Sequence, residues 1–239
     1  MKKFIDPNSL LLWYPKTKNL DIPQPRTEIV EVPFNSLVGM MDGKKLPSNY
    51  KLDIILKAEE IGYPLFLRTD LSSGKHQWKD TCFVEKEEDL FQHIYNVVEF
   101  NLLCDMLGLH CQAIVLREFL ELGWKFKAFM GELPIAPEIR VFAKDGEVIC
   151  FHAYWFKDAI EKGGTEHLPK NWEKILKATN TFYPVEIKLL RAYAREISKK
   201  LKGYWSIDFA KDRGGKWWFI DAALGERSWH SDDCPKKKK

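Results

Sequence analysis

Apolar and polar positions follow two patterns along this chain, and each pattern predicts a different kind of secondary structure. Apolar residues that recur every three or four positions predict helices over residues 48–61, 87–107 and 185–201, the first of them capped by Ser48. Short apolar runs and alternation predict strands, and Lys144-Asp145-Gly146 is a hairpin turn signal between two of them. The predicted strands cover residues 27–32, 65–68, 81–84, 111–120, 138–143, 148–153, 204–210 and 216–222.

The remaining stretches carry little periodicity. Residues 1–47 are rich in proline and hold only short β-like pieces, so we expect an extended lead-in that wraps around the fold. Residues 157–183 surround Gly163-Gly164 without a clear period, and we expect an irregular segment there. The order of helices and hairpins is not the alternation of a doubly wound fold, and it predicts an α+β protein with antiparallel sheets.

Composition and charge narrow the class of protein. With 239 residues, of which 45% are hydrophobic and 30% charged, the chain has the balance of a folded protein with a sizeable core. The net charge is only +3, and the lysine run 236–239 alone contributes four positive charges. The rest of the chain is therefore close to neutral, and we expect no nucleic-acid binding. No apolar run is long enough to span a membrane, and we expect no membrane partner.

The number and spacing of the cysteines indicate the cellular compartment in which we expect the protein. They are five, an odd number, and no CxxC pair occurs, which argues against a disulfide framework and against a zinc ribbon. We expect most of them to be small core residues in a reducing compartment, and hence a cytoplasmic protein. The five are Cys82, Cys104, Cys111, Cys150 and Cys234.

Common catalytic and nucleotide-binding motifs are missing from the sequence. Gly74-Lys75 invites comparison with a P-loop, but Thr69 stands where the first glycine is required and His76 where Ser or Thr is required. There is also no GxGxxG, HExxH or GxSxG. The commoner dinucleotide, zinc-protease and serine-hydrolase classes are therefore excluded.

A polar loop after the predicted strand 65–68 is the first candidate site. Arg68 ends the strand and Lys75 ends the loop, with Ser72, Ser73 and Gly74 between them. Backbone N–H groups and hydroxyls of such a loop donate hydrogen bonds to phosphates, while the two cations supply charge. The alternative is an ordinary polar hairpin loop with two surface cations.

Two acids inside apolar strands near the C-terminal end are the second candidate. Asp208 and Asp221 each interrupt an apolar strand, and buried carboxylates are costly unless they are paired or bind a metal. If the two strands are antiparallel neighbours, both acids can share one Mg²⁺, which prefers carboxylates together with substrate phosphates. The alternative is that either acid caps the backbone or pairs with an arginine such as Arg140.

Two further segments carry charge at the edge of apolar strands. Glu138 and Arg140 lie two residues apart on one face of a predicted strand, where the arginine suits a transferring phosphoryl group or forms a structural ion pair. The strand 111–120 ends in charge, which predicts either an interdomain hinge whose backbone reads adenine or a solvated strand end. The residues of that hinge are Arg117, Glu118, Phe119, Leu120 and Glu121.

In their order and spacing, these four pieces resemble the ATP-grasp superfamily over residues 44–229. The resemblance implies two α+β lobes with antiparallel sheets that clasp ATP. It divides the chain into a proline-rich lead-in (1–43), an N-terminal lobe (44–116), a C-terminal lobe (117–230) and a basic tail (231–239). The sequence is most similar to the small arginine-bearing ATP-grasp proteins of phage and bacterial mobile elements.

The chain departs from the family pattern at two positions that concern the site. The family usually has a lysine where Arg68 stands. On the last strand it has a glutamate followed two residues later by an asparagine, and here that pair is Asp221 and Ala223. One metal ligand is then missing unless Ser228, Glu226 or a water replaces it.

The resemblance implies an ATP-dependent and Mg²⁺-dependent ligase that phosphorylates a carboxylate and joins it to an amine. Arg68 and Lys75 would hold the β- and γ-phosphates, Arg140 would steady the acyl phosphate, and Asp208 with Asp221 would bind Mg²⁺. The substrates stay unnamed, and a peptide or protein end is our expectation for one of them.

Two other functions compete with ligation. The missing asparagine favours an assembly chaperone or a nucleotide-gated binding module, similar to a eukaryotic ATP-grasp protein that helps to assemble a translation initiation factor. Nucleotidyl transfer such as RNA ligation would need a lysine that forms a nucleotide adduct, and no KxDG sequence is present.

Overall fold

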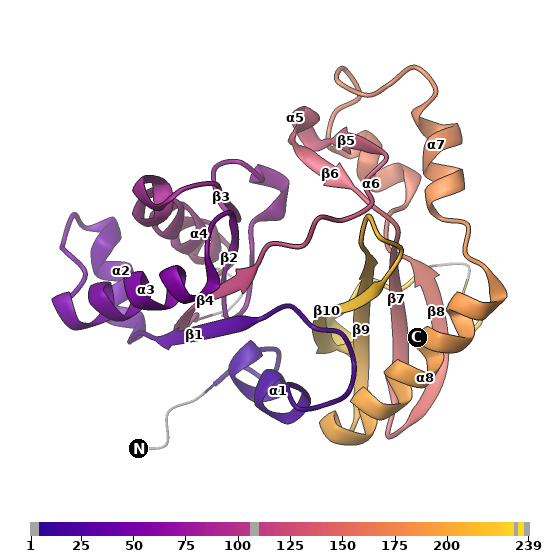
Figure 1. Cartoon of the computed structure of the whole chain (residues 1–239), viewed down its shortest axis with the longest axis horizontal. Coiled ribbons are helices and arrows are strands. Elements are labelled where there is room, and N and C mark those ends of the chain that lie inside the picture. Colours follow the sequence, from indigo (N-terminus) through magenta and orange to yellow (C-terminus); the bar gives the residue numbers. More distant parts are fainter. Residues whose placement is uncertain (1–4, 106–109, 232–233, 237–239) are drawn as a thin grey trace. The chain divides into compact units, whose positions relative to one another are not determined.

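The computed structural model describes residues 5–105, 110–231 and 234–236. The chain divides into two compact units (Figure 1). Unit 1 consists of Met1–Leu11 and Pro25–Leu120, and unit 2 consists of Leu12–Gln24 and Glu121–Lys239. Each unit therefore combines a short N-terminal piece with a long continuous segment.

Unit 1 is built on a sheet of four antiparallel strands in the order β1-β4-β2-β3. Helices pack on one face of this sheet, because alternate strand residues such as Leu65, Leu67, Ile114 and Leu116 form one core with apolar helix residues such as Ile54. The strands are β1 (Thr27–Glu31), β2 (Leu65–Thr69), β3 (Phe83–Val84) and β4 (Ala113–Glu118), and the helices are α2 (Phe34–Met41), α3 (Ser48–Ile61) and α4 (Leu90–Asp105).

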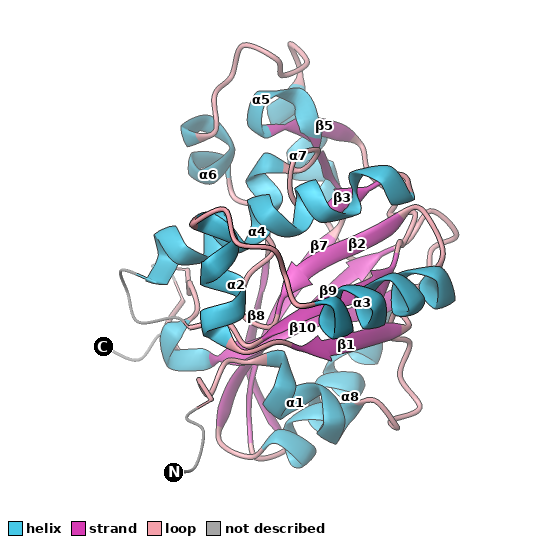
Figure 2. Ribbon diagram, turned by 90° about the vertical axis from the view of Figure 1, so that its left-hand side faces the viewer, coloured by secondary structure: helices cyan, strands magenta, loops and turns pink. Residues whose placement is uncertain are grey.

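Unit 2 contains a second antiparallel sheet of four strands, in the order β10-β9-β7-β8. Helix α8 (Pro184–Leu201) contacts β7, β8 and β9, and the small hairpin β5–β6 forms a separate sheet in the same unit (Figure 2). The strands are β5 (Phe126–Ala128), β6 (Leu133–Ile135), β7 (Glu138–Lys144), β8 (Glu147–Ala153), β9 (Tyr204–Lys211) and β10 (Trp217–Leu224).

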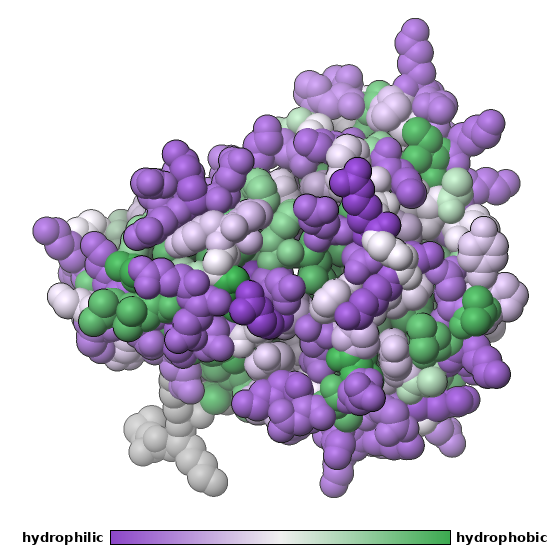
Figure 3. Space-filling model, viewed as in Figure 1, coloured by the Kyte–Doolittle hydropathy of each residue, from purple (hydrophilic) through white to green (hydrophobic). Residues whose placement is uncertain are grey.

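Shorter elements complete the chain. They are α1 (Leu10–Thr17), α5 (Phe129–Glu132), α6 (Lys157–Lys162), α7 (Trp172–Thr179), and the 3₁₀ turns η1 (Lys75–Gln77), η2 (Glu87–Asp89) and η3 (Gly225–Arg227). Polar and charged side chains cover most of the face shown in Figure 3. Within the described ranges, no helix is both long and apolar enough to cross a membrane.

The strongest periodic signals are confirmed. The helices predicted over 48–61 and 185–201 are present, and so are the hairpins around the Lys144–Gly146 turn and around residues 211–215. The helix predicted over 87–107 is present as α4, but its residues 87–89 form a 3₁₀ turn and residues 106–107 lie outside the described residues. Pro47, and not Ser48, occupies the position before helix α3, and it makes no side-chain cap.

The weakest signals led to wrong predictions. The segment 157–183 is not irregular, because α6 and α7 lie in it, and α7 buries Trp172, Leu176 and Thr179 at helical spacing among charged neighbours. The lead-in holds two helices, one with Pro15 inside it. Such short helices bury a few residues each, so tertiary packing rather than local pattern stabilises them.

Glu186 fastens helix α8 to the sheet of unit 2. Its Oε1 accepts hydrogen bonds from Lys211 Nζ at 2.6 Å and Trp217 Nε1 at 3.0 Å, and its Oε2 accepts one from the Tyr183 N–H at 2.9 Å. Burial alone would raise the pKa of this carboxyl, but the hydrogen bonds from Lys211, Tyr183 and Trp217 outweigh it and the pKa is lowered.

Replacing Glu186 with glutamine should therefore lower the free energy of unfolding by about 1 kcal/mol at neutral pH. Since a lowered pKa contributes stability above the ordinary value of 4.5, the difference between the two proteins should vanish as the pH falls through the folded-state pKa. Urea unfolding at several pH values measures this. Glu196→Gln is the matched control, because the Glu196–Lys199 pair on the same helix is exposed. An equal effect of both variants would contradict the prediction.

Candidate functional site

A row of polar residues crosses the sheet of unit 2 from one edge to the other. His152 on β8 is the register partner of Arg140 on β7, Arg140 is the partner of Asp208 on β9, and Asp208 is the partner of Asp221 on β10. Side chains of register partners point to the same face of a sheet. The antiparallel pairing brings together residues that are widely separated in the sequence.

Arg140 and Asp208 form a bidentate ion pair in the middle of this row. Arg140 Nε donates to Asp208 Oδ1 and Arg140 Nη2 donates to Asp208 Oδ2, both at 2.8 Å. The two side chains are only 14% and 8% exposed, so the pair is largely shielded from water. The guanidinium also lies over the Tyr154 ring, 4.8 Å from its centre.

This pairing is the alternative that the sequence left open for Asp208. Burial alone would lower the pKa of the Arg140 guanidinium, but the charge and hydrogen bonds of Asp208 outweigh it and the pKa is raised. Each carboxylate oxygen keeps a second lone pair when it accepts from arginine. The ion pair is therefore compatible with metal binding by Asp208.

Asp221 lies beside Asp208 on the edge strand. The register shifts between Phe219 and Asp221, which marks an irregularity of the bulge type, and such bulges redirect the side chains that follow them. Asp221 Oδ1 accepts a hydrogen bond from the Ala222 N–H at 3.0 Å. The expectation that β9 and β10 are antiparallel neighbours is confirmed, and the two acids are cross-strand partners.

Ala223 occupies the position of the missing asparagine, and two small hydroxyl residues lie beside it. Ala223 is the register partner of Ser206, whose Oγ lies 2.6 Å from Ser228 Oγ. The Ser228 hydroxyl also donates to the Leu224 carbonyl at 3.0 Å. Glu226 is exposed in the η3 turn. Of the side chains considered as replacements, Ser228 is the one that lies beside the partner of Ala223.

In unit 1, two arginines share the sheet face opposite the helices. Arg68 on β2 pairs with Val115 on β4, and Arg117 on β4 pairs with Phe66 on β2, so both alternate with the core residues. Both side chains are buried, and Arg68 Nε donates to its neighbour's carbonyl, Thr69 O, at 3.0 Å. Arg117 Nε donates to Thr27 Oγ1 at 3.2 Å.

The polar loop after β2 is held in shape by its own hydrogen bonds. The Ser72 N–H donates to Thr69 Oγ1 at 2.9 Å and the Ser72 hydroxyl donates to Asn101 Oδ1 at 3.0 Å. Gly74 has a left-handed φ of 60°, and a Cβ added there would lie 3.1 Å from Thr81 Cγ2. The donors of Ser72 are thus used inside unit 1, and after Ser73 and Gly74 the turn η1 begins at Lys75.

The predicted hinge begins with the last two residues of β4, Arg117 and Glu118, and continues through the three residues after the strand. Glu118 Oε2 accepts a hydrogen bond from the Arg26 N–H at 3.0 Å, and Phe119 packs against the rings of Trp78 and Phe83. Leu120 is the last residue of unit 1. Glu121 belongs to unit 2, where its largely exposed carboxylate lies 4.0 Å from Arg213 Nη1.

Several residues of interest were not identified from the sequence. Asp70 is fully buried, and Tyr154 covers the Arg140 guanidinium. The cysteines were also misjudged, because only Cys82 and Cys111 are buried. Cys150 and Cys234 lie beside two histidines, His152 and His230. The spacings Cys-x-His on a strand and His-x₃-Cys after it were the available signal.

A comparison with models of protein families identifies the family of this chain. The model described as "ATP-grasp domain, R2K clade family 3" matches residues 55–236, which is most of the chain. The chain belongs to this family. ATP-grasp proteins are typically ATP-dependent carboxylate–amine ligases, and the α+β ATP-grasp fold expected from the sequence is confirmed. No match was found among curated proteins.

Solved structures share the fold of this ATP-grasp chain at low sequence identity. C-terminally truncated Cdc123 from Schizosaccharomyces pombe is 14% identical, with a TM-score of 0.58, and the match covers 91% of this chain and 83% of that one. D-alanine–D-alanine ligase from Bacillus anthracis, complexed with ATP, is 10% identical with a TM-score of 0.50. That match covers 90% of this chain but only 54% of the ligase. At these identities the likeness concerns the fold.

Proposed function

We propose that this ATP-grasp protein is an ATP- and Mg²⁺-dependent ligase that activates a carboxylate as an acyl phosphate and joins it to an amine. The observation that carries the proposal is the row Arg140–Asp208–Asp221 on three adjacent strands of unit 2. It combines two carboxylates with one arginine on one sheet face. That set suits a divalent cation and a phosphoryl group side by side.

The donors in this row fit Mg²⁺. Asp208 and Asp221 offer hard oxygen ligands on neighbouring strands, and Mg²⁺ is commonly held by one or two carboxylates together with substrate phosphates. Ser228 is placed to orient a water in the position of the missing asparagine. A Mg²⁺ ion held by Asp208 and Asp221 would neutralise negative charge on the phosphates.

Arg140 would steady the acyl phosphate. Its Nε and Nη2 atoms each donate to Asp208, and one Nη1–H points to the Trp229 carbonyl at 3.4 Å. The remaining N–H groups are left to donate to a phosphoryl oxygen. The Asp208 pair and the Tyr154 ring hold the guanidinium in one orientation, so little reorganisation is needed when charge develops.

Most of the residues proposed to bind the nucleotide belong to unit 1. Arg68 and Lys75, with the loop residues Ser73 and Gly74, would hold the β- and γ-phosphates, while the segment Arg117–Glu121 would receive the adenosine. Since the Ser72 donors are occupied within unit 1, we assign Ser72 a role in shaping the loop through Asn101. Catalysis would come from positioning and charge stabilisation, as is usual in phosphoryl transfer.

We propose that the acceptor is the end of a peptide or protein. We also propose that the chain belongs to the small arginine-bearing ATP-grasp proteins of phage and bacterial mobile elements. Arg68 in place of the family lysine supports the second point. The proposed peptide acceptor can be tested by incubating the protein with ATP, Mg²⁺ and mixtures of peptides. Mass spectrometry should then detect a product whose mass is that of two components minus one water.

Calorimetric titration of ATP with and without Mg²⁺ tests the nucleotide site. The natural protein should bind ATP in a Mg²⁺-dependent manner. The Asp208→Asn, Asp221→Asn double variant should bind at least about tenfold more weakly, because both oxygen ligands lose their charge. Asp158→Asn changes an exposed acid of the same unit and should bind as the natural protein does. Mg²⁺-dependent ATP binding that is undiminished in the double variant would contradict the assignment of Asp208 and Asp221 as Mg²⁺ ligands.

A nucleotide-gated binding module without ligation is the second candidate. It is favoured by Ala223, which has no oxygen ligand at the position of the family asparagine. ATP binding without ADP or phosphate release, with any carboxylate and amine offered, would support this function. Formation of a ligation product would rule out this second function.

A further inference from the structure

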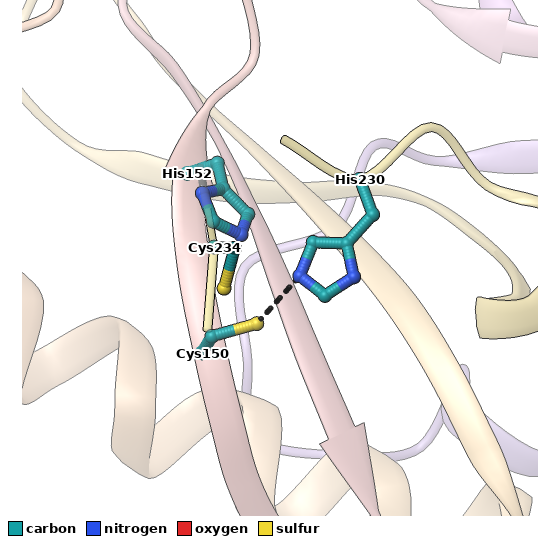
Figure 4. Close-up of side chains that lie close together, drawn as sticks. All are labelled: Cys150, His152, His230 and Cys234. Atoms are coloured by element: carbon teal, nitrogen blue, oxygen red, sulfur yellow. Dashed lines mark hydrogen bonds between the residues drawn. The ribbon is translucent and has the colours of Figure 1, made fainter. Parts of the chain in front are cut away.

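Four side chains with metal-binding atoms converge at the outer strand of the unit 2 sheet. Cys150 and His152 come from β8, and His230 and Cys234 come from the segment after η3. One ligand atom from each residue lies within 4.8 Å of the other three (Figure 4). None of these residues has a role in the proposed ATP and Mg²⁺ site, although His152 ends the polar row that contains Arg140.

The local structure explains why they meet. Residues two apart on a strand point to the same face, so β8 presents Cys150 and His152 together. His230 is stacked on the Phe142 ring, with ring centres 4.2 Å apart, and Phe142 is the register partner of Cys150. Packing against β7 thus fixes the imidazole of His230 next to the sulfur of Cys150.

The donor set is that of a tetrahedral zinc site. Two cysteine sulfurs and two histidine nitrogens form a common structural Zn²⁺ site, with Zn–S bonds of about 2.3 Å and Zn–N bonds of about 2.0 Å. Tetrahedral geometry then separates the ligand atoms by roughly 3.3–3.8 Å. Cys150 Sγ already lies 3.1 Å from His230 Nε2, and the 4.8 Å limit on the others requires only side-chain adjustments.

One buried histidine nitrogen at the site has no hydrogen-bond partner among the described residues, which supports the binding of a metal ion there. His152 Nε2 is buried and has no hydrogen-bond partner among the described residues. Figure 4 shows a ring nitrogen of His152 directed towards the two sulfurs. A buried polar atom without a partner is costly, and a coordinate bond to a metal would satisfy it.

The charge balance also suits zinc. Binding releases one proton from each thiol, and Zn²⁺ with two thiolates and two neutral imidazoles carries no net charge. Arg191 and Lys236 line the same surface depression as Cys150 and Cys234. A disulfide between Cys150 and Cys234 would use only the sulfurs and would leave the buried His152 Nε2 without a partner among the described residues.

We propose that Cys150, His152, His230 and Cys234 bind a structural Zn²⁺ ion. The ion would tie the C-terminal segment to β8. This matters for the neighbouring row because the carbonyl of Trp229 accepts from Arg140 Nη1, the Trp229 ring stacks on Phe156, and His152 is the register partner of Arg140. The zinc site would therefore position the segment that contacts Arg140.

Metal content of the untagged protein tests the proposal. Purified without chelators, it should contain about one zinc per chain by elemental analysis, and Cys150→Ser and His230→Asn should each contain less than about a tenth of that. The matched controls are Cys104→Ser and His167→Asn, which change a cysteine and a histidine outside the cluster and should keep the zinc. A metal content that is equal in all five proteins would overturn the proposal.

Cobalt substitution and mass spectrometry cover the case in which a variant does not fold. Chelator-treated natural protein should bind one Co²⁺ and show the visible and thiolate charge-transfer absorption of a tetrahedral sulfur-ligated site. A chelator should also lower the melting temperature of the natural protein. Absence of the cobalt bands, or a Cys150–Cys234 disulfide in the intact mass of freshly purified protein, would refute the zinc site.

Discussion

Replacing Arg140 with methionine is expected to lower the free energy of unfolding of unit 2 by about 3–5 kcal/mol. The change leaves the Asp208 carboxylate, which is 8% exposed, without the bidentate partner that compensates its burial. Chemical denaturation followed by tryptophan fluorescence measures the loss. Arg213→Met is the control, because the Arg213–Glu121 pair is exposed and should contribute less than about 1 kcal/mol.

The paired replacement separates stability from function. Arg140→Met combined with Asp208→Leu removes both charges and should recover most of the stability, since apolar residues often replace a buried ion pair without loss. ATP turnover should be absent in the single and the double variant alike, because both lack Arg140, the arginine that we propose binds the phosphoryl group. If the double variant turned over ATP at the natural rate, the role proposed for Arg140 would be wrong. A single variant as stable as Arg213→Met would contradict the structural argument.

Replacing Asp70 with alanine should destabilise unit 1 by about 2–4 kcal/mol. Asp70 is fully buried directly after β2, and its Oδ1 accepts hydrogen bonds from the N–H groups of Gln112 at 2.7 Å and Ala113 at 3.1 Å. Its Oδ2 accepts one from the Ser9 hydroxyl at 2.5 Å. The alanine would leave two buried backbone donors at the start of β4 unsatisfied and would release the N-terminal segment.

Asparagine at the same position should be tolerated, at a loss below about 1 kcal/mol, because its oxygen can accept from both N–H groups and its amide can donate to Ser9. Burial raises the pKa of the Asp70 carboxyl, although hydrogen bonds from Ser9, Gln112 and Ala113 oppose this. The folded natural protein therefore binds this proton more tightly than the unfolded chain does. Its stability should fall as the pH rises from the ordinary value of 3.8 through the raised pKa, and Asp70→Asn should lack this loss.

Thermal unfolding of these Asp70 variants between pH 3 and pH 8 checks both expectations. Asp80→Ala, at an exposed acid of the same unit, is the control and should change the stability by less than about 0.5 kcal/mol. An asparagine variant as unstable as the alanine variant would show that the negative charge, rather than the hydrogen bonds, stabilises this position.

The sequence alone was sufficient for the elements with strong local patterns and for the family. Helix α8 shows a helical period over many residues, and the turns at Asp145-Gly146 and 211–215 define two hairpins. Because the turn between β9 and β10 sets which strands are neighbours, the sequence also placed Asp208 and Asp221 on adjacent strands. Short helices such as α7 were missed, because their apolar residues are few and lie among charged ones.

Only the tertiary structure decided which distant residues meet. The register of β7 against β9 places Arg140 opposite Asp208, and no local pattern encodes that pairing. The same applies to Asp70, whose partners come from the N-terminal segment and from β4, and to the cysteines and histidines that gather beside β8. Local periodicity specifies an element and its buried face, whereas strand register and long-range packing determine the neighbours of each polar side chain.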